Sequence, residues 1–559
     1  MNRRDWAECA GIAAIAVALL LPFVAKPIHL DDPMYLWAAR HIQAHPLDFY
    51  GFSVNWYGFL QPMAEANYNP PLISFYLAAV AALFGWSEPA LHAALLVPAI
   101  AALLAVRALA RDLGAQPVGA ALTTLAMPAF LVSSTTLMAD ILMLSFWCGA
   151  LALWVRGFAT GRNASLLGAA VLAGLCPLAK YSGASVIPLL FAYAAWRERR
   201  IGRWVWLLAI PVALLVAYDA LYWALYGVHA VSGAATYTLA TRARTTSFAD
   251  QLLVGLLFLG GCLIAPLVYA PFLWKRRGVV LGALATIGVV AVWVALGDLA
   301  GFRIRSGTDV RWDIAVQMVF FLGAAIHLFA LATSDLFRRR DAGAVLLFLW
   351  VAGIFVFASV VNWTTNARAV LPAAPAAAIL CWRRLALEPR FLAQRRLLRL
   401  APLVPAAALS LAVAWGDQQL AVSAREAVAT VIEHESPPAP GKLWFEGAWG
   451  FQYYMEARGA RRIAVPTDLE PGDRVVTPGN NVQRVLLPSQ VMEHWKAVQI
   501  PVRSWVATFS RAGGAGFYAS EWGPLPFVLG PVPPELYAVD VIRVPVRLRG
   551  PDRAVEGSP

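Results

Sequence analysis

The sequence predicts an all-α bundle that crosses a membrane about thirteen times, followed by a soluble C-terminal α/β domain. Of 559 residues, 60% are hydrophobic and only 14% are charged, whereas soluble domains carry about 25% charged residues. The mean hydropathy is +0.61, and a soluble fold could not hide so much apolar side chain. Apolar runs of span length recur through residues 1–416 and are missing from residues 417–559. We therefore predict a membrane domain at 1–416 and a soluble domain at 417–559.

The apolar runs define the candidate spans, because a bilayer core needs about 20 mostly apolar residues per helix, with a range of about 17–25. They lie near residues 8–25, 88–106, 117–134, 138–155, 164–179, 182–196, 204–225, 251–273, 278–297, 314–334, 342–361, 369–382 and 400–416. The runs at 164–179, 182–196 and 369–382 are shorter than the ideal length. The stretch that follows Pro70-Pro71 and ends at Gly85 has about 14 residues and would be about 21 Å long as a helix. It is predicted not to cross but to lie half-inserted or on the membrane surface.

Positive charge is concentrated in the membrane part. Residues 417–559 contain 14 Lys and Arg against 15 Asp and Glu, which leaves 31 against 18 in residues 1–416. The basic residues form short clusters between apolar runs, as orientation signals do, and not one face of a nucleic-acid-binding domain. With thirteen spans, all these clusters fall on the cytoplasmic side. The loop 26–70, later outer loops and the tail then face the periplasm across a cell inner membrane.

Neither the tail nor the cysteines indicate a catalytic or metal-binding site. Gly441–Trp449 and Arg474–Val476 are predicted to contain strands, and frequent Pro and Gly mark turns. The five cysteines lie in or beside apolar runs without metal-ligand spacing, so neither a zinc site nor a disulfide framework is predicted.

Ionisable groups at membrane depth are expensive, so each is a candidate functional residue. Asp31 and Asp32 follow the first span directly. Two adjacent carboxylates repel each other, which can hold one proton on the pair and suits a general base. The alternative is that Asp32 caps a surface helix while Asp31 is solvated.

Three further charges interrupt apolar sequence on the same predicted side. Asp140 is either a functional carboxylate or a helix cap. Lys180, followed by Tyr181, either contacts a phosphate or extends to the lipid headgroups. Asp219 lies near the outer end of its span and could pair with a neighbouring helix.

Several arginines fall in outer loops, where the charge distribution predicts few. Either the topology differs locally, or these residues bind an anion such as phosphate, which the Arg fork suits. They are Arg242, Arg244, Arg303, Arg305 and Arg311, and Arg368 has the same potential.

Five motifs occur in a fixed order: Asp31-Asp32 with Tyr35, Asn69-Pro70-Pro71-Leu72, Asp140, Lys180-Tyr181, and Arg368 to Pro372 in an Arg-x-x-x-Pro segment. This ordered set, over roughly residues 1–380, resembles the multi-pass glycosyltransferases of the GT-C fold that use polyprenyl-phosphate sugars. The resemblance is to the family-39-like branch of protein O-mannosyltransferases and the lipid A aminoarabinose transferase. Trp444 to Gly447 and Trp449 to Tyr454 resemble the C-terminal domain of bacterial members.

The resemblance implies transfer of a sugar from a polyprenyl-phosphate donor to a lipid, glycan or protein acceptor at the periplasmic face. Asp31 would deprotonate the acceptor, which attacks the anomeric carbon with inversion. Asp32 and Asp140 would complete the catalytic set, and Asp140 would orient the acceptor or the first loop.

The same resemblance implies that Lys180 and an outer arginine steady the phosphate leaving group, an electrostatic role. The implied substrate-binding residues are Tyr35, Asn69, Lys180, Tyr181 and Arg368. No cofactor is implied, and no metal is expected between Asp31 and Asp140, although oligosaccharyl transferases of the fold use one. Two departures stand out: Asn69 replaces the family's Lys or His, and Asp32 replaces a Glu.

Two other classes of protein compete with the enzyme. A lipid flippase or transporter usually has paired halves and interrupted helices at a midplane site, whereas this sequence has no internal repeat and its acids gather at one surface. A membrane assembly factor would use Asp31 and Asp140 only as helix caps. A labelled polyprenyl-phosphate sugar separates them: the enzyme cleaves it, the flippase moves it intact, and the scaffold does neither.

Overall fold

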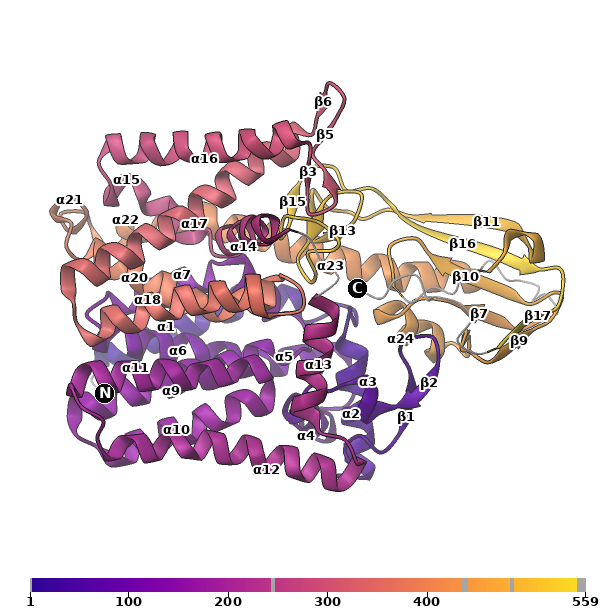
Figure 1. Cartoon of the computed structure of the whole chain (residues 1–559), viewed down its shortest axis with the longest axis horizontal. Coiled ribbons are helices and arrows are strands. Elements are labelled where there is room, and N and C mark those ends of the chain that lie inside the picture. The colour runs from indigo at the N-terminus through magenta and orange to yellow at the C-terminus, as the bar shows by residue number, and fades with distance from the viewer. Residues whose placement is uncertain (1–2, 243–246, 434–440, 483–486, 550–559) are drawn as a thin grey trace.

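A computed structural model describes residues 3–242, 247–433, 441–482 and 487–549. Long helices run side by side in a bundle, and a smaller domain containing a β-sheet projects from one end (Figure 1). We call this the outer end of the bundle and the opposite end, where the N-terminus lies, the inner end. The predicted fold class, a helical membrane bundle with a C-terminal α/β domain, is confirmed.

Within the described ranges, eight helices are long and apolar enough to cross a membrane, or nine if one bent pair counts as a single span. The bent pair consists of α14 (Phe248–Cys262) and the segment Ala265–Leu273, which ends in α15 (Ala270–Leu273), and it changes direction by 67°. The eight spans contain α1 (Arg3–Leu20), α5 (Glu88–Ala94) with α6 (Leu96–Asp112), α9 (Asp140–Thr160), α12 (Ala209–Tyr226), α16 (Arg276–Leu296), α17 (Trp312–Arg339), α18 (Ala342–Val356) and α23 (Leu403–Glu433). The chain is a multi-pass membrane protein.

The remaining four predicted spans coincide with shorter helices. These are α7 (Pro117–Leu125) with α8 (Pro128–Ser133), α10 (Asn163–Ala179), α11 (Val186–Glu198) and α20 (Ala374–Leu385). Every residue of α8 and almost every residue of α20 is buried. At membrane depth, a segment that is surrounded by protein can contain non-helical backbone, because it does not face lipid. These helices therefore do not need the full length of a lipid-exposed span.

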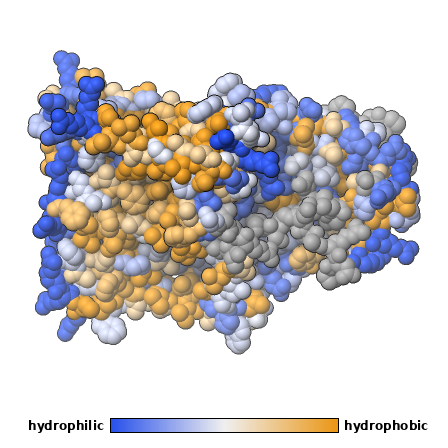
Figure 2. Space-filling view, turned by 45° about the horizontal axis from the view of Figure 1, so that its top comes forward, coloured by the Kyte–Doolittle hydropathy of each residue, from blue (hydrophilic) through white to orange (hydrophobic). Residues whose placement is uncertain are grey.

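The charged clusters that were predicted to be cytoplasmic gather at the inner end. Arg107 lies 2.7 Å from both Asp5 and Glu8, and Arg383 lies 3.2 Å from Asp335. Figure 2 shows an apolar band between this hydrophilic rim and the more polar outer end. The arrangement matches a bundle embedded in lipid, with the basic clusters on one side of it.

The stretch at 70–85 forms a single helix, α4 (Leu72–Phe84), of 13 residues. At 1.5 Å per residue it is about 20 Å long, shorter than a bilayer core. It packs against α2 (Asp32–Ala44), the helix that begins with the second of the two adjacent acids. Its predicted place at the membrane surface stays a prediction.

The outer domain is built on a five-stranded sheet in the order β11-β16-β10-β7-β8. The strands are β7 (Leu443–Phe445), β8 (Arg461–Arg462), β10 (Arg474–Pro478), β11 (Met492–Ile500) and β16 (Glu535–Ile542). β7 pairs in parallel with β8 and β10, while β16 is antiparallel to β10 and β11. Helix α24 (Trp449–Ala457) connects β7 to β8. The two predicted strand regions therefore hold β7 and β10.

The predicted domain boundary at residue 417 lies inside a continuous helix. Helix α23 runs through Asp417 to Glu433, and its last turns pack on the sheet through Ala427 and Val431. In the opposite sense, the segment 506–528 returns to the bundle and packs in its core. Within it, the Phe527 ring lies 4.9 Å from that of Phe321 in α17. The bundle and the outer domain are therefore joined both by α23, which packs on the sheet, and by the segment 506–528, which packs in the bundle.

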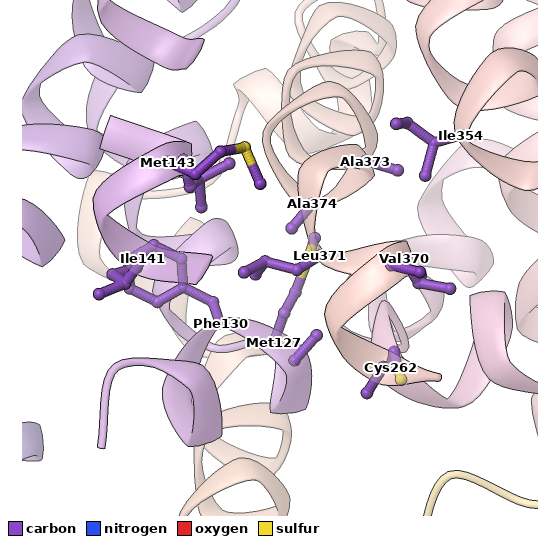
Figure 3. Packing of buried hydrophobic residues seen from close by; sticks show 14 of the residues in the cluster. Met127, Phe130, Ile141, Met143, Cys262, Ile354, Val370, Leu371, Ala373 and Ala374 are labelled. Atoms are coloured by element: carbon purple, nitrogen blue, oxygen red, sulfur yellow. The ribbon is translucent and has the colours of Figure 1, made fainter. Parts of the chain in front are cut away.

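The bundle core lies directly beneath the candidate site. Figure 3 shows Phe130, Ile141, Cys262, Ile354 and Leu371 packed together from α8, α9, α14, α18 and the turn before α20. All five are buried. Helix α9 begins at the predicted site residue Asp140, and the turn that holds Leu371 directly follows α19 (Ala367–Val370), which carries Arg368. A close-packed core holds such elements in fixed positions.

A buried ion pair joins the first loop, α23 and the segment 506–528. The Lys26 ammonium lies 2.5 Å from the Asp417 carboxylate, and both side chains are fully buried. Asp417 also accepts hydrogen bonds from the Tyr518 hydroxyl at 2.7 Å and the Thr508 hydroxyl at 2.9 Å. No pattern in the sequence indicated this pair.

We expect Lys26→Met to lower the free energy of unfolding by about 3–5 kcal/mol, because it leaves Asp417 buried without its cation. Denaturation of the purified chain in mixed micelles measures the change. The double variant Lys26→Met/Asp417→Asn removes both charges and should recover part of the loss, and Lys442→Met at an exposed position is the control. A Lys26→Met chain as stable as the parent contradicts the assignment.

Candidate functional site

Asp31 is an accessible acid at the outer end. It precedes α2, whose second residue is Pro33, and its side chain makes no capping hydrogen bond to that helix. Leu30 before it has a positive φ of 43°, which turns the chain sharply into α2. The Asp31 side chain is 39% exposed, and its Oδ2 lies 3.2 Å from the Arg368 Nη2. It can therefore meet both a cation and an incoming molecule.

Asp32 lies in a different environment, although it is adjacent in sequence. It is fully buried, and its two carboxylate oxygens accept hydrogen bonds from the backbone N–H groups of His29 at 3.0 Å and Leu137 at 2.9 Å. Burial raises the pKa of Asp32 to about 7. The side chain joins the first loop to the loop before Asp140, and it does not cap its own helix.

Asp140 and Asp31 meet through Arg368. Asp140 is the first residue of α9 and is 1% exposed; its Oδ1 lies 2.6 Å from the Lys180 Nζ. Its Oδ2 lies 4.0 Å from the Arg368 Nη1. Lys180 ends α10, and Arg368 lies in α19 (Ala367–Val370), which Asn366 caps by accepting a hydrogen bond from the Ala369 N–H. Four distant parts of the chain thus bring two acids and two cations together.

Burial and the neighbouring charges shift the pKa values of the two cations in this cluster. Burial lowers the pKa of Lys180, although Asp140 beside it favours the ammonium form. Burial would also lower the pKa of Arg368, but the carboxylates of Asp140 and Asp31 outweigh that effect and raise it above its usual value. Arg368 therefore remains a cation that an anion can approach, and Lys180 lies beside it on the same carboxylate.

A cavity of about 840 Å³ opens beside the cluster. Six of the eight predicted site residues line it: Asp31, Tyr35, Asn69, Lys180, Tyr181 and Arg368. The other two, Asp32 and Asp140, lie behind its wall. Asn69 is held by a hydrogen bond from its side-chain amide to Asn67 Oδ1 at 2.9 Å. The size is that of a pocket for a small-molecule ligand.

The outer domain supplies part of the cavity wall. Trp449, Phe509, Tyr518 and Trp522 line the cavity. The Tyr518 ring lies 5.8 Å from the Arg368 guanidinium, within the range of a cation–π contact. Trp449 opens the segment Trp449 to Tyr454 that the sequence already marked, whereas no local motif marks Phe509, Tyr518 or Trp522.

The remaining predicted charges lie apart from the site. Asp219 pairs with His229 at 2.8 Å and accepts a hydrogen bond from the Val231 N–H, so it holds the start of α13 (Ala230–Arg242). Arg303 and Arg305 are exposed, and they lie in β4 (Phe302–Arg303) and β5 (Arg305–Ser306) of two successive hairpins at the outer end (Figure 1). Arg311 pairs with Asp313. The Arg242 side chain and Arg244 lie outside the described residues.

Three or more His, Cys, Asp or Glu side chains do not gather into a possible metal site anywhere in the described ranges. Asp31 and Asp140 contact cations instead of each other. The expectation of no metal and no cofactor stays a prediction.

Comparisons with known proteins support the resemblance. A family model described as dolichyl-phosphate-mannose-protein mannosyltransferase matches residues 68–223, which include Asn69, Asp140, Lys180 and Tyr181. The match confirms the predicted resemblance over the part of the chain that it covers. No curated protein matches the chain.

Three solved structures are similar to this one. The apo oligosaccharyltransferase of Archaeoglobus fulgidus has 16% identity and a TM-score of 0.49, covering 82% of this chain and 64% of its own. ArnT from Cupriavidus metallidurans, bound to undecaprenyl phosphate, has 14% identity and a TM-score of 0.48, with coverages of 86% and 94%. The S. cerevisiae protein O-mannosyltransferase complex bound to its sugar donor has 16% identity, a TM-score of 0.32 and coverages of 40% and 34%. The chain therefore spans about 64% of the length of the archaeal enzyme.

We expect Asp32→Ala to lower the free energy of unfolding by about 2–3 kcal/mol, because it leaves two buried backbone N–H groups without an acceptor. Denaturation in mixed micelles measures it, with Asp309→Ala in the exposed strand β6 (Asp309–Val310) as the control. If Asp32 instead took part directly in chemistry, its removal would change the rate and leave stability unchanged.

Proposed function

We propose that this chain is a membrane glycosyltransferase that moves a sugar from a polyprenyl-phosphate donor to an acceptor at the outer face of the membrane, with inversion. The observation that carries the proposal is the accessible Asp31 carboxylate facing a cavity whose wall also holds the Lys180 and Arg368 cations. The matched family model adds support, since its description is that of a dolichyl-phosphate-mannose transferase.

The cavity suits a donor whose phosphate lies at the edge of the bilayer. Lys180 and Arg368 place positive charge where a phosphate would lie, and the Arg fork can bind two of its oxygens. Part of the wall is apolar, with Leu215 of α12, Phe357 and Val361 beyond α18, and residues of α13. A lipid chain would meet that part, while its phosphate and sugar face the acids.

The proposed reaction is a single displacement. Asp31 accepts the proton of the acceptor hydroxyl or amine as that group attacks the anomeric carbon. The bond between the anomeric carbon and the phosphate oxygen breaks, and its electron pair goes to the leaving polyprenyl phosphate. Lys180 and Arg368 stabilise the added negative charge, which is the kind of electrostatic assistance worth most where water is excluded.

Asp140 and Asp32 have positioning roles in this proposal. Asp140 holds both cations, at 2.6 Å and 4.0 Å, so that they face the phosphate in fixed places. Asp32 fixes the loop that carries Asp31 against the loop before Asp140. Catalytic groups need such support, since small displacements of a reacting group greatly lower rates.

Sidedness and partners are part of the same proposal. The basic clusters at the inner end favour a cytoplasmic inner end, which would place the cavity and the outer domain in the periplasm of a cell with an inner membrane. The acceptor, a lipid, glycan or protein, would then approach from that side, and no nucleotide would be required.

We expect Asp31→Asn to lower transfer by at least about 100-fold, because the amide cannot accept the proton. The assay uses the full chain in proteoliposomes, a set of tritiated undecaprenyl-phosphate monosaccharides, and membranes of a gene-deleted source strain as acceptor. Asp309→Asn is the control, and both variants should insert normally. Full transfer by Asp31→Asn excludes Asp31 as the base; donor that crosses the bilayer without cleavage favours the flippase.

We expect Lys180→Met to weaken product inhibition by undecaprenyl phosphate by about tenfold or more, since a charge-assisted contact to the phosphate is lost. The inhibition constant is measured in the same proteoliposomes, with Lys442→Met as the control. Thermal unfolding is recorded in parallel, because Asp140 loses its partner. Unchanged inhibition in a well-folded variant places the phosphate elsewhere.

A further inference from the structure

Three aromatic side chains form one wall of the cavity at the outer domain. We call Trp449, Phe509 and Trp522 the aromatic corner. The rings of Phe509 and Trp522 are stacked at 4.7 Å and 12°, and Trp449 meets both edge-on at 5.4 Å and 5.7 Å. Phe509 and Trp522 are buried, whereas Trp449 is half-buried and faces the space that Asp31 also lines.

Two neighbouring asparagines hold the aromatic corner in place. Asn480 accepts a hydrogen bond from the Trp522 indole N–H at 2.8 Å and donates one to the Phe509 carbonyl at 3.0 Å. Asn481 accepts a hydrogen bond from the Ala448 N–H at 2.8 Å and donates to the Ala448 carbonyl at 3.3 Å, immediately before Trp449. The rings are therefore fixed before any ligand arrives, which is how binding surfaces limit the loss of entropy on binding.

Trp449 has a strained backbone. Its φ is +67°, a conformation that is a true outlier for a bulky residue. The next residue, Gly450, presses against the loop that carries Asp31: a Cβ at Gly450 would lie 2.1 Å from the Ile28 carbonyl oxygen. Strain of this kind is concentrated at ligand clamps and active sites. The same turn thus fixes both the Trp449 ring and the acid loop.

A second, smaller space continues behind Trp449. A cavity of about 40 Å³ shares Leu30, Trp449 and Phe509 with the large one and is lined by polar groups, among them Ser423 and Glu535. Glu535 accepts a hydrogen bond from the Asn480 side chain at 3.1 Å. Ring faces with a polar recess beside them match a ligand that is both ring-shaped and rich in hydroxyl groups.

We propose that the aromatic corner binds a sugar ring of the acceptor, so that the acceptor is a carbohydrate; this rests on the proposed transfer reaction. One face of a pyranose exposes C–H groups that pack on the electron-rich faces of aromatic rings, and its hydroxyls reach the polar recess. A peptide acceptor in extended form would need a row of backbone donors and acceptors. In the described part of the cavity, this wall offers rings and side chains instead.

The test measures binding without donor, so it does not depend on transfer. The labelled full chain in lipid nanodiscs is applied to arrays of immobilised oligosaccharides and of Ser- and Thr-containing peptides. Binding to at least one oligosaccharide class is expected, at least about tenfold weaker in Trp449→Gly and largely kept in Trp449→Phe. Trp495→Ala, an exposed tryptophan of the same domain that does not line the cavity, should bind as the parent does.

Stability distinguishes loss of the ring from loss of the fold. Glycine suits a positive φ, so Trp449→Gly should unfold at a higher temperature than Trp449→Ala while both lose the oligosaccharide. Binding to peptides alone, no oligosaccharide binding, or unchanged binding by Trp449→Gly overturns the inference. Oligosaccharide binding without transfer would contradict only the proposed function, and transfer to an acceptor that carries no sugar would contradict only the carbohydrate acceptor.

Discussion

The outer end of the bundle depends on the mutual compensation of four charges. Asp140 is almost wholly buried, Arg368 nearly so, and neither could remain charged there alone without a large loss of solvation free energy. Lys180 and Arg368 face Asp140, and Arg368 reaches on to Asp31. Because these residues come from the first loop, the start of α9, the end of α10 and α19, their compensation requires those four segments to converge.

The same requirement makes the outer domain part of the site. The Tyr518 ring lies against the Arg368 guanidinium, and the Tyr518 hydroxyl donates a hydrogen bond to Asp417. Asp417 also pairs with Lys26, at the start of the loop that carries Asp31. Tyr454 of α24 accepts a hydrogen bond from the Ile28 N–H in that loop at 2.7 Å. The loop therefore has contacts with the bundle on one side and with the domain on the other. Neither part alone would hold Asp31 where it is.

The charged site residues could be predicted because a charge in apolar sequence is conspicuous. Asp140, Lys180 and Arg368 were found in this way, and the ordered motifs placed them on one face. The Lys26–Asp417 pair was not found, since its members are 391 positions apart and neither lies in a local pattern. The sequence also could not tell the two adjacent acids apart. Only the structure shows that Asp32 is buried and bound to two backbone N–H groups, whereas Asp31 is accessible.

Long spans were predicted better than short ones for a related reason. Length and hydropathy mark a helix that must face lipid on its own, but α8 and α20 are enclosed by other helices, and their length is set by packing. The breaks next to such helices are where polar side chains can enter the bundle. Arg368 lies directly before the turn that leads into α20, and Lys180 lies between α10 and α11.

On the proposed function, the pairing of Arg368 also couples the two substrates. In this structure Arg368 is divided between Asp31 and Asp140. The phosphodiester of the donor carries one negative charge, as a carboxylate does, but it presents two free oxygens to the Arg368 fork and would compete with Asp31 for the guanidinium. The Asp31 carboxylate would then be more free to accept a proton from the acceptor. The base would thus become most effective once the donor is in place, which protects the donor from attack by water when the cavity is only half filled.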